Sequence, residues 1–205
     1  MRIHRVLTGL VLLTSTLLTA PPAAAAPSRT ATVHEGSGDD VFRVKTTKDR
    51  GIMKITHTGE QNFAVWSLKP GGDKNDLHVN RIGDYSGTVV YNLYGWHKTS
   101  AFEVNADGDW KIEIKPITSA PLWKTATVRL SGDRVLKLPA PTKGLRTMRY
   151  RHAGDANFVV YAFPGTGNPS LLVNKIGKVS GKVAIPAGTR YVSVSANGAW
   201  YLVRK

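Results

Sequence analysis

The sequence predicts an all-β protein made of two tandem, small antiparallel β-sandwiches, Ig-like or jelly-roll-like, without disulfides. Residues 56–65 return in closely similar form as residues 151–160, so the chain is an internal repeat. Short runs of alternating apolar and polar residues, separated by Gly, Pro, Asn and Asp, recur about every ten residues, which is typical of a sandwich. The chain has no cysteine, and each sandwich must therefore depend on its hydrophobic core.

The repeat and the composition of the N-terminus together predict the domain boundaries. Residues 1–25 have a basic start, an apolar stretch and an alanine-rich end, a pattern typical of a secretory signal peptide that is cleaved after Ala25. A short tail follows at residues 26–29. We predict the first sandwich at residues 30–124 and a second, strongly basic sandwich at residues 125–205. The expected location is extracellular or on the cell wall.

Both units are expected to contain the same series of short strands. In the first unit the alternating runs predict strands at residues 41–45, 52–57, 63–68, 77–80, 87–91, 101–104 and 110–115. In the second unit the corresponding runs are residues 135–138, 147–152, 158–163, 171–174, 182–185, 191–194 and 200–203. Seven or eight strands per unit fit a small sandwich.

The last two predicted strands of each unit look like a hairpin. A three-residue loop at Ala106-Asp107-Gly108 would place Trp110 opposite Val104 and keep one face of the hairpin apolar. Gly108 would then take the left-handed position of a bulged turn. The same register in the second unit puts Trp200 opposite Val194. Both tryptophans are therefore predicted to be core residues rather than platforms for a sugar.

The segment between the units, residues 116–123, is short and apolar. Such a composition does not suit a flexible tether, because flexible linkers are rich in Gly and Ser. We expect the two sandwiches to be in contact, with Trp123 packed between them.

Charge is distributed unevenly over the two units. Residues 30–124 contain 12 Lys+Arg and 12 Asp+Glu, whereas residues 125–205 contain 13 Lys+Arg and 2 Asp+Glu. A solvated surface usually mixes both signs, so the second unit points to an anionic partner. Alternation places Arg149 and Arg151 on the solvated face of one strand. The predicted binding residues are Arg146, Arg149, Arg151, Lys175, Lys178, Lys182 and Arg190.

A loop with no counterpart in the second unit supplies an alternative site. Tyr94, Trp96 and His97 lie in this loop, where the repeat itself does not require aromatic residues. Exposed aromatic side chains on a loop are common in binding surfaces. The alternative function is a protein-binding module, for instance an inhibitor of a secreted hydrolase.

The sequence offers little for catalysis, cofactors or metals. It contains no metal-ligand spacing and no motif of a nucleophile or phosphate loop, so we expect no enzyme activity, no cofactor and no bound metal. The side chains of Asp39, Asp40, Asp73, Asn75 and Asp76 offer the oxygen ligands that calcium prefers, but they match no calcium-binding loop. His57 and His152 occupy equivalent places in the repeat and are interpreted as structural.

Four runs resemble a known family. They are S-G-D-D-V at residues 37–41, T-H-T-G-x-x-N-F-A-V-W at residues 56–66, L-x-V-N-x-I-G-D-Y-S-G-T-V at residues 77–89, and A-D-G-D-W-x-I-x-I-x-P at residues 106–116. They look like the tandem β-sandwich repeats of secreted actinobacterial proteins, and the resemblance covers nearly all of the predicted mature chain. It implies export, a repeated unit and a β fold, with no catalytic residues to carry over.

These observations lead to one expected function. The chain is predicted to be a secreted, non-catalytic protein that docks through its basic second unit on an anionic polysaccharide or other wall polymer. A secreted protein partner is the alternative, nucleic acid is not expected, and no run after the signal peptide is long and apolar enough to cross a membrane.

Overall fold

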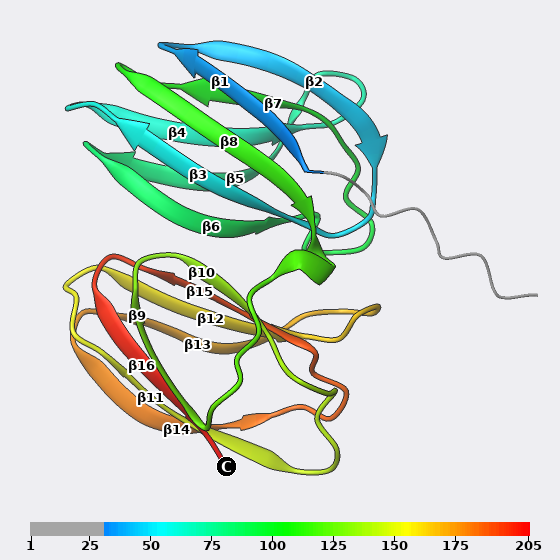
Figure 1. Ribbon diagram of the computed structural model, residues 1–205, viewed down its shortest axis with the longest axis vertical. Coiled ribbons are helices and arrows are strands. Elements are labelled where there is room, and N and C mark those ends of the chain that lie inside the picture. Colours follow the sequence, from blue (N-terminus) through cyan, green and yellow to red (C-terminus); the bar gives the residue numbers. More distant parts are fainter. Residues whose placement is uncertain (1–30) are drawn as a thin grey trace, which may run out of the picture.

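The computed structural model describes residues 31–205, and within them it is almost entirely β-structure. Figure 1 shows two units one above the other, the first in blue to green and the second in green to red. The predicted signal peptide and the predicted N-terminal tail lie outside the described residues.

Sixteen strands form the described part of the chain. In the first unit they are β1 (Thr32–Ser37), β2 (Asp40–Thr47), β3 (Gly51–Thr58), β4 (Asn62–Leu68), β5 (Lys74–Ile82), β6 (Tyr85–Tyr91), β7 (Thr99–Asn105) and β8 (Asp109–Pro116). A short 3-10 helix, η1 (Ile117–Ser119), leads out of β8. The second unit contains β9 (Thr127–Ser131), β10 (Arg134–Lys137), β11 (Arg146–His152), β12 (Asn157–Phe163), β13 (Ser170–Ile176), β14 (Val179–Ile185), β15 (Tyr191–Ala196) and β16 (Ala199–Arg204).

Each unit is a sandwich of two four-stranded antiparallel sheets. The strand orders are β1-β8-β3-β6 and β2-β7-β4-β5 in the first unit, and β9-β16-β11-β14 and β10-β15-β12-β13 in the second. Apart from the β4–β5 and β12–β13 hairpins, consecutive strands lie in opposite sheets. This order is that of a jelly roll. The predicted sandwich fold is therefore confirmed, and of the two architectures expected the jelly roll is the one found.

All fourteen predicted strands are present in the described chain, and each unit has one more at its start. The sequence reading omitted β1 and β9, which are edge strands of their sheets. In β1 only His34 and Gly36 are partly buried, so its alternation of apolar residues is weak.

The predicted hairpins at the end of each unit are wrong. β7 pairs with β2 and β4, whereas β8 pairs with β1 and β3, so the loop at residues 106–108 crosses from one sheet to the other. Trp110 lies opposite Gly36 and His57 rather than Val104. In the second unit Trp200 likewise lies opposite Leu130 and His152, because β15 and β16 belong to different sheets.

Gly108 has a different role from the one expected. The φ angle of Gly108 is not positive, so this glycine is not a left-handed turn residue. A Cβ at this position would instead lie 2.0 Å from the Thr58 carbonyl oxygen. Gly108 is needed because the crossing loop passes directly against the end of β3.

The prediction that both tryptophans are buried is confirmed. Trp110 and Trp200 are each 3% exposed, and their indole Nε1–H groups donate to the carbonyl oxygens of Gly38 and Gly132 at 2.9 Å. Trp110 packs in one core cluster with Val104. The apolar alternation was therefore correctly assigned to the inside, although the two residues meet across the sandwich instead of within one sheet.

The two units are in contact, but Trp123 does not lie between them. Trp123 is 2% exposed and belongs to the core of the second sandwich. The cluster between the units consists of other buried residues: Ile52, Ala120, Val135, Phe163 and Tyr191. In Figure 1 strand β6 of the first unit faces β10 and β15 of the second.

A buried carboxylate reinforces this contact. The Tyr85 hydroxyl of β6 donates to Asp133 Oδ2 at 2.7 Å, and the backbone N–H of Ala196 donates to Asp133 Oδ1 at 2.8 Å. Arg81 Nη2 lies 3.5 Å from the same Oδ1. Asp133 is 2% exposed, so these contacts compensate a charge that would otherwise be costly to bury.

Candidate functional site

The outer surface of the sheet β14-β11-β16-β9 gathers much of the charge of the second unit. Strand register places Arg149 next to Lys182 of β14, and Arg151 next to Tyr201 of β16. Tyr201 in turn lies opposite Arg129 of β9, whose guanidinium carbon is 5.9 Å from the centre of the Tyr201 ring. We call this surface the basic face and define it by Arg129, Arg149, Arg151, Lys182 and Tyr201.

The basic face is hollowed beside its row of long side chains. One open hollow of about 570 Å³ is lined by Lys178, Ser180, Arg151 and Tyr201, among others. A second, of about 590 Å³, is lined by Arg129, Ser131, Arg134, Arg151 and Tyr201, among others. Arg151, Ala153 and Tyr201 line both hollows, so the two adjoin each other, and together we call them the groove of the basic face. Neighbouring strands are about 4.8 Å apart, and four strands give a groove wide enough for an extended chain.

On the equivalent surface of the first unit, positive and negative side chains pair with each other. By register, Glu35 occupies the place of Arg129 and Glu113 that of Val203. Glu35 pairs with Lys111 and raises its pKa. Glu113 pairs with Lys115 and, at 3.2 Å, with Lys54, and these two cations lower its pKa.

The second unit has neither glutamate at these positions, and it has additional cations on the equivalent sheet. Thr56 and Thr88 of the first unit correspond by register to Arg151 and Lys182. Within residues 31–205 none of the cations of the basic face forms an ion pair. The two carboxylates of the unit lie elsewhere: Asp133 is buried at the contact between the units, and Asp155 accepts a hydrogen bond from Asn197.

The structure separates the seven predicted basic residues. Arg149, Arg151 and Lys182 lie on the basic face, and Lys178 lines its groove. Lys175 instead lies on β13, the edge strand of the other sheet, so it is not part of the basic face. Arg146 begins β11 and lines a different hollow, together with Lys143 and Arg204.

Arg190 is also away from the basic face. It precedes β15, and its backbone N–H donates to the Phe163 carbonyl oxygen at 2.9 Å. Its carbonyl oxygen accepts from the Leu138 N–H at 2.8 Å. Through these two main-chain hydrogen bonds Arg190 links the end of β12 to the residue that follows β10.

Sequence reasoning missed Arg129 and Tyr201. The segment Thr127-Val128-Arg129-Leu130-Ser131 does alternate, with Val128 and Leu130 packed on the core, so a signal for Arg129 was present. Tyr201 follows the buried Trp200 and must therefore point outward. That the two side chains are neighbours depends on the pairing of β9 with β16, which the sequence alone does not give.

The aromatic loop is used partly for the contact between the units. The ring of Tyr94 stacks on that of Trp96, with centroids 5.0 Å apart, and its hydroxyl hydrogen-bonds that of Tyr161 in the second unit. That bond raises the pKa of Tyr161 to about 12. His97 Nδ1 lies 2.7 Å from Asp76 Oδ2. Only Trp96 remains widely exposed, at 64%.

The two equivalent histidines hold turns. His57 Nδ1 lies 3.0 Å from the Gly83 carbonyl oxygen, and His152 Nδ1 lies 2.9 Å from that of Gly177. Each imidazole stacks on a buried phenylalanine, at 4.2 Å in the first unit and 4.8 Å in the second. Their partners are the turns that precede β6 and β14 rather than the turns that follow the histidines themselves.

Among residues 31–205 no three His, Asp or Glu side chains converge in a way that would hold a metal ion. The acidic residues considered for calcium are engaged separately: Asp39 accepts from the Ala106 N–H at 2.9 Å, and Asp76 pairs with His97. No helix in the described chain has the length and apolar character needed to span a bilayer.

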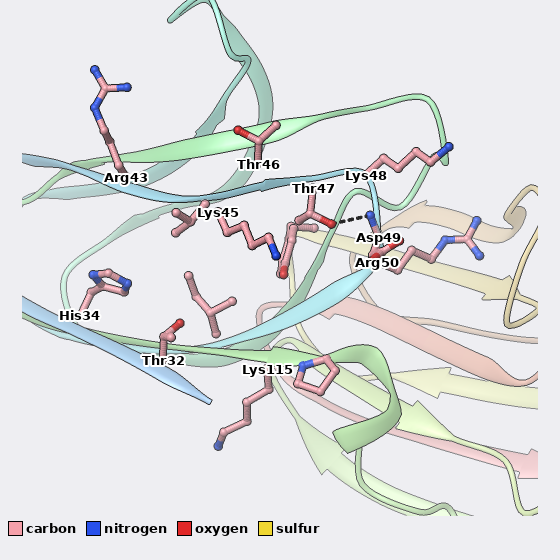
Figure 2. Close-up of a pocket in the computed structure, with 14 residues that line it drawn as sticks. Thr32, His34, Arg43, Lys45, Thr46, Thr47, Lys48, Asp49, Arg50 and Lys115 are labelled. Carbon is pink, nitrogen blue, oxygen red and sulfur yellow. Dashed lines mark hydrogen bonds between the residues drawn. The ribbon is translucent and has the colours of Figure 1, made fainter. Parts of the chain in front are cut away.

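A cavity lies in the first unit, at the mouth of the sandwich between β1 and β2. Its volume is about 720 Å³, and its lining includes Val44, Tyr91 and Ile114. Figure 2 shows the Lys45 side chain running into this cavity, whereas Arg43 and Lys115 point away from it. The pairing of β2 with β7 is irregular between Arg43 and Thr47, and such a bulge re-aims the side chains of a strand.

Comparisons with known proteins identify no relative: no family model and no curated protein matches this chain. The resemblance to the tandem β-sandwich repeats of secreted actinobacterial proteins therefore stays a prediction.

Proposed function

We propose that this protein is a secreted, non-catalytic binding protein whose second unit holds an anionic polymer of the cell envelope, such as a uronic or phosphate-bearing wall polysaccharide. The observation that carries the proposal is the absence of any paired carboxylate on the basic face of the described chain, in contrast to the balanced face of the first unit.

The arrangement of the basic face supports an extended, negatively charged ligand. Arg129 and Arg151 flank the Tyr201 ring, so a sugar ring could rest on the aromatic side chain while its charged groups reach two guanidinium groups. The groove crosses several strands instead of ending in a deep pocket. This shape suits a polymer better than a small molecule.

Exposed charges act through a screened field. The Debye length is about 10 Å at 0.1 M salt, so binding to the basic face should weaken steeply as ionic strength rises. One exposed cation alone contributes little to the binding free energy, so binding of a polymer needs several neighbouring cations.

The decisive experiment gives the second unit the two glutamates of the first. Arg129→Glu combined with Val203→Glu should weaken binding to polygalacturonate by about tenfold or more at low salt, because it restores carboxylates beside Tyr201 and Arg149. The matched control is Lys175→Glu with Ile176→Glu, which changes the net charge equally on β13 of the other sheet. Ile176 is not needed for the core, since it is 77% exposed.

Binding is measured by sedimentation with the insoluble polymer and by calorimetry, with neutral dextran as the reference. The expected result is a large loss for the first pair of substitutions and a small loss for the control. Equal losses would mean that only net charge matters, and unaltered binding by both variants would reject the basic face as the site.

The alternative, a protein-binding module, is favoured by one observation. Trp96 is 64% exposed although it stacks on Tyr94. Retention of a single secreted protein by the wild-type chain, with loss of that retention in Trp96→Ala, would move the assignment to the aromatic loop.

A further inference from the structure

The contact between the two units joins two different surfaces, and within the described chain the opposite surface of each unit stays uncovered. The first unit contributes the margin of β5 and β6, and the second contributes β10, β15 and the turn before β10. Figure 1 shows the free counterparts at the two ends of the molecule, with β2 and β7 at one end and β14 at the other. The two units share one topology, so positions can be matched by strand register.

Asp39 of the first unit is the counterpart of the buried Asp133. Both follow a glycine with positive φ, and both accept a backbone N–H through Oδ1, from Ala106 at 2.9 Å and from Ala196 at 2.8 Å. Oδ2 of Asp133 accepts from Tyr85 of the other unit. Asp39 is exposed, and no other side chain of the described residues pairs with it. The first unit therefore holds the same carboxylate in the same turn, without the partner that Asp133 has.

The groups that bind Asp133 have counterparts on the free margin of the second unit. Arg81 of β5, whose Nη2 lies 3.5 Å from Asp133 Oδ1, corresponds to Lys175 of β13. The backbone N–H of Thr88, on the open edge of β6, donates to the Asp133 carbonyl oxygen at 2.9 Å. Its counterpart is Lys182, on the open edge of β14. The second unit thus offers a cation and a strand edge at the places that the first unit uses for its contact.

A phenol is present at the same place in both units, although different strands supply it. The Tyr85 hydroxyl, which donates to Asp133, lies beside Gly87 of β6. The matching glycine of β14 is Gly181, and the hydroxyl beside it belongs to Tyr150 of β11. Tyr150 is 8% exposed, and no hydrogen bond of its hydroxyl is found within residues 31–205. Buried hydroxyl groups normally have a partner, so Tyr150 is a donor for a carboxylate at the β14 margin.

Exposed apolar side chains adjoin both free surfaces. Val41, which is 56% exposed, corresponds by register to Val135, which is buried between the units. Leu145, which is 82% exposed, takes the position of Arg50. Arg50 crosses to the second unit, where it donates to the Pro164 carbonyl oxygen at 3.0 Å. Burial of Val41 and Leu145 in an equivalent contact would remove apolar surface from water.

We propose that the chain associates head to tail with a second copy of itself, and that this contact repeats the one between its own two units. The head is the sheet β2-β7-β4-β5 together with Asp39, and the tail is the margin of β13 and β14. The Tyr150 hydroxyl and the Lys175 ammonium group of one copy bind Asp39 of the next. The positive second unit thereby meets the neutral first unit. Head and tail lie at opposite ends of one chain, so further copies add at both ends and form a filament.

This association does not rest on the polymer proposed above, and the two are compatible on one chain. Arg129 and Arg151 of the basic face correspond by register to Glu35 and Thr56 of the first unit. Both counterparts are exposed although the first unit is already in contact with the second. The equivalent contact of the second unit therefore leaves Arg129 and Arg151 open, and self-association is measured without any polymer.

The first test is sedimentation equilibrium of the predicted mature chain, residues 26–205. The weight-average mass should rise continuously with concentration between about 10 µM and 1 mM, a range that suits a small contact without a covalent tether. A mass that stays at the monomer over this range would overturn the proposal. A mass that stops at the dimer would also overturn it, because a head-to-tail contact leaves two ends free.

Two variants each block one end. Asp39→Asn keeps the Oδ1 acceptor, but it removes the negative charge and presents an amide N–H group to the phenol. Tyr150→Phe with Lys175→Gln keeps the buried ring and removes both donors from the tail. Each variant should weaken self-association by about tenfold or more. Asp109→Asn is the matched control for the head, because its counterpart Ala199 is exposed beside the existing contact.

The control for the tail is Tyr201→Phe with Arg151→Gln, which removes one hydroxyl and one charge from the same sheet. Their counterparts Lys111 and Thr56 are exposed in the first unit, so this variant should associate like the wild type. Blocked variants that behave like their matched controls would contradict the assignment of head and tail.

A mixture of the two blocked variants distinguishes this contact from a symmetric one. Asp39→Asn retains an intact tail, and the Tyr150 and Lys175 double variant retains an intact head. Equal amounts should form a 1:1 dimer at a concentration where neither variant associates alone, and absence of this dimer would refute the proposal. Wild-type association that appears only when the chain begins at Ala31 would do the same, because the preceding residues would then be the partner of the head.

Discussion

At the scale of single residues, the most informative ionisable group is His78 on β5. Its Nε2 is buried with no hydrogen-bond partner among the described residues, and its ring contacts Phe102 edge-on at 6.1 Å between centroids. Burial lowers the pKa of His78 to about 4, against the partial opposite effect of Asp76. The corresponding residue in the second unit is Leu172, so the fold itself does not need a histidine here.

This pKa predicts a pH dependence of stability. Above about pH 6.5 the histidine is neutral in both states, but between that value and pH 4 the unfolded chain binds the proton more readily. The free energy of unfolding should therefore fall on acidification through this range, by about 3 kcal/mol at most. His78→Leu should show a flatter pH profile in urea denaturation than the wild type. Parallel profiles would contradict the assignment.

At the scale of secondary-structure elements, the junction of β6 with β10 depends on one phenol. Burial and the Asp133 carboxylate raise the pKa of Tyr85, which stays neutral and donates to Asp133 at 2.7 Å. Tyr85→Phe leaves a buried carboxylate with one fewer donor and should cost about 1–3 kcal/mol in the free energy of unfolding. Tyr201→Phe is the control, because no hydrogen bond of its hydroxyl is found within the described chain. Equal midpoints in urea for the two variants would argue against a role for the buried hydrogen bond.

At the scale of the whole molecule, the position of Trp123 decides where the second unit begins. A fragment of residues 119–205 keeps this tryptophan, whereas one of residues 125–205 lacks it. Loss of a fully buried tryptophan side chain costs about 3–5 kcal/mol, so the shorter fragment should melt at a clearly lower temperature or fail to fold. Circular dichroism during heating measures the difference. Similar melting temperatures would show that Trp123 is dispensable for the second core.

The sequence by itself determined the repeat, the predicted strands, the inward direction of Trp110 and Trp200 and the excess of positive charge in the second unit. These are local properties, because a period of two residues assigns each side chain to the apolar or the solvated side of its own strand. The alternation does not name the partner strand: a hairpin of β7 with β8 and a crossing to the opposite sheet both direct the same residues to one core.

Only the tertiary structure decided the strand pairing and therefore which side chains meet on the basic face. The pairing of β9 with β16 brings Arg129 beside Tyr201, although the two are far apart in the chain. The same pairings place Lys175 on a different sheet from Arg149. The packing of Trp123 inside the second unit likewise follows from contacts between distant segments, which no local pattern encodes.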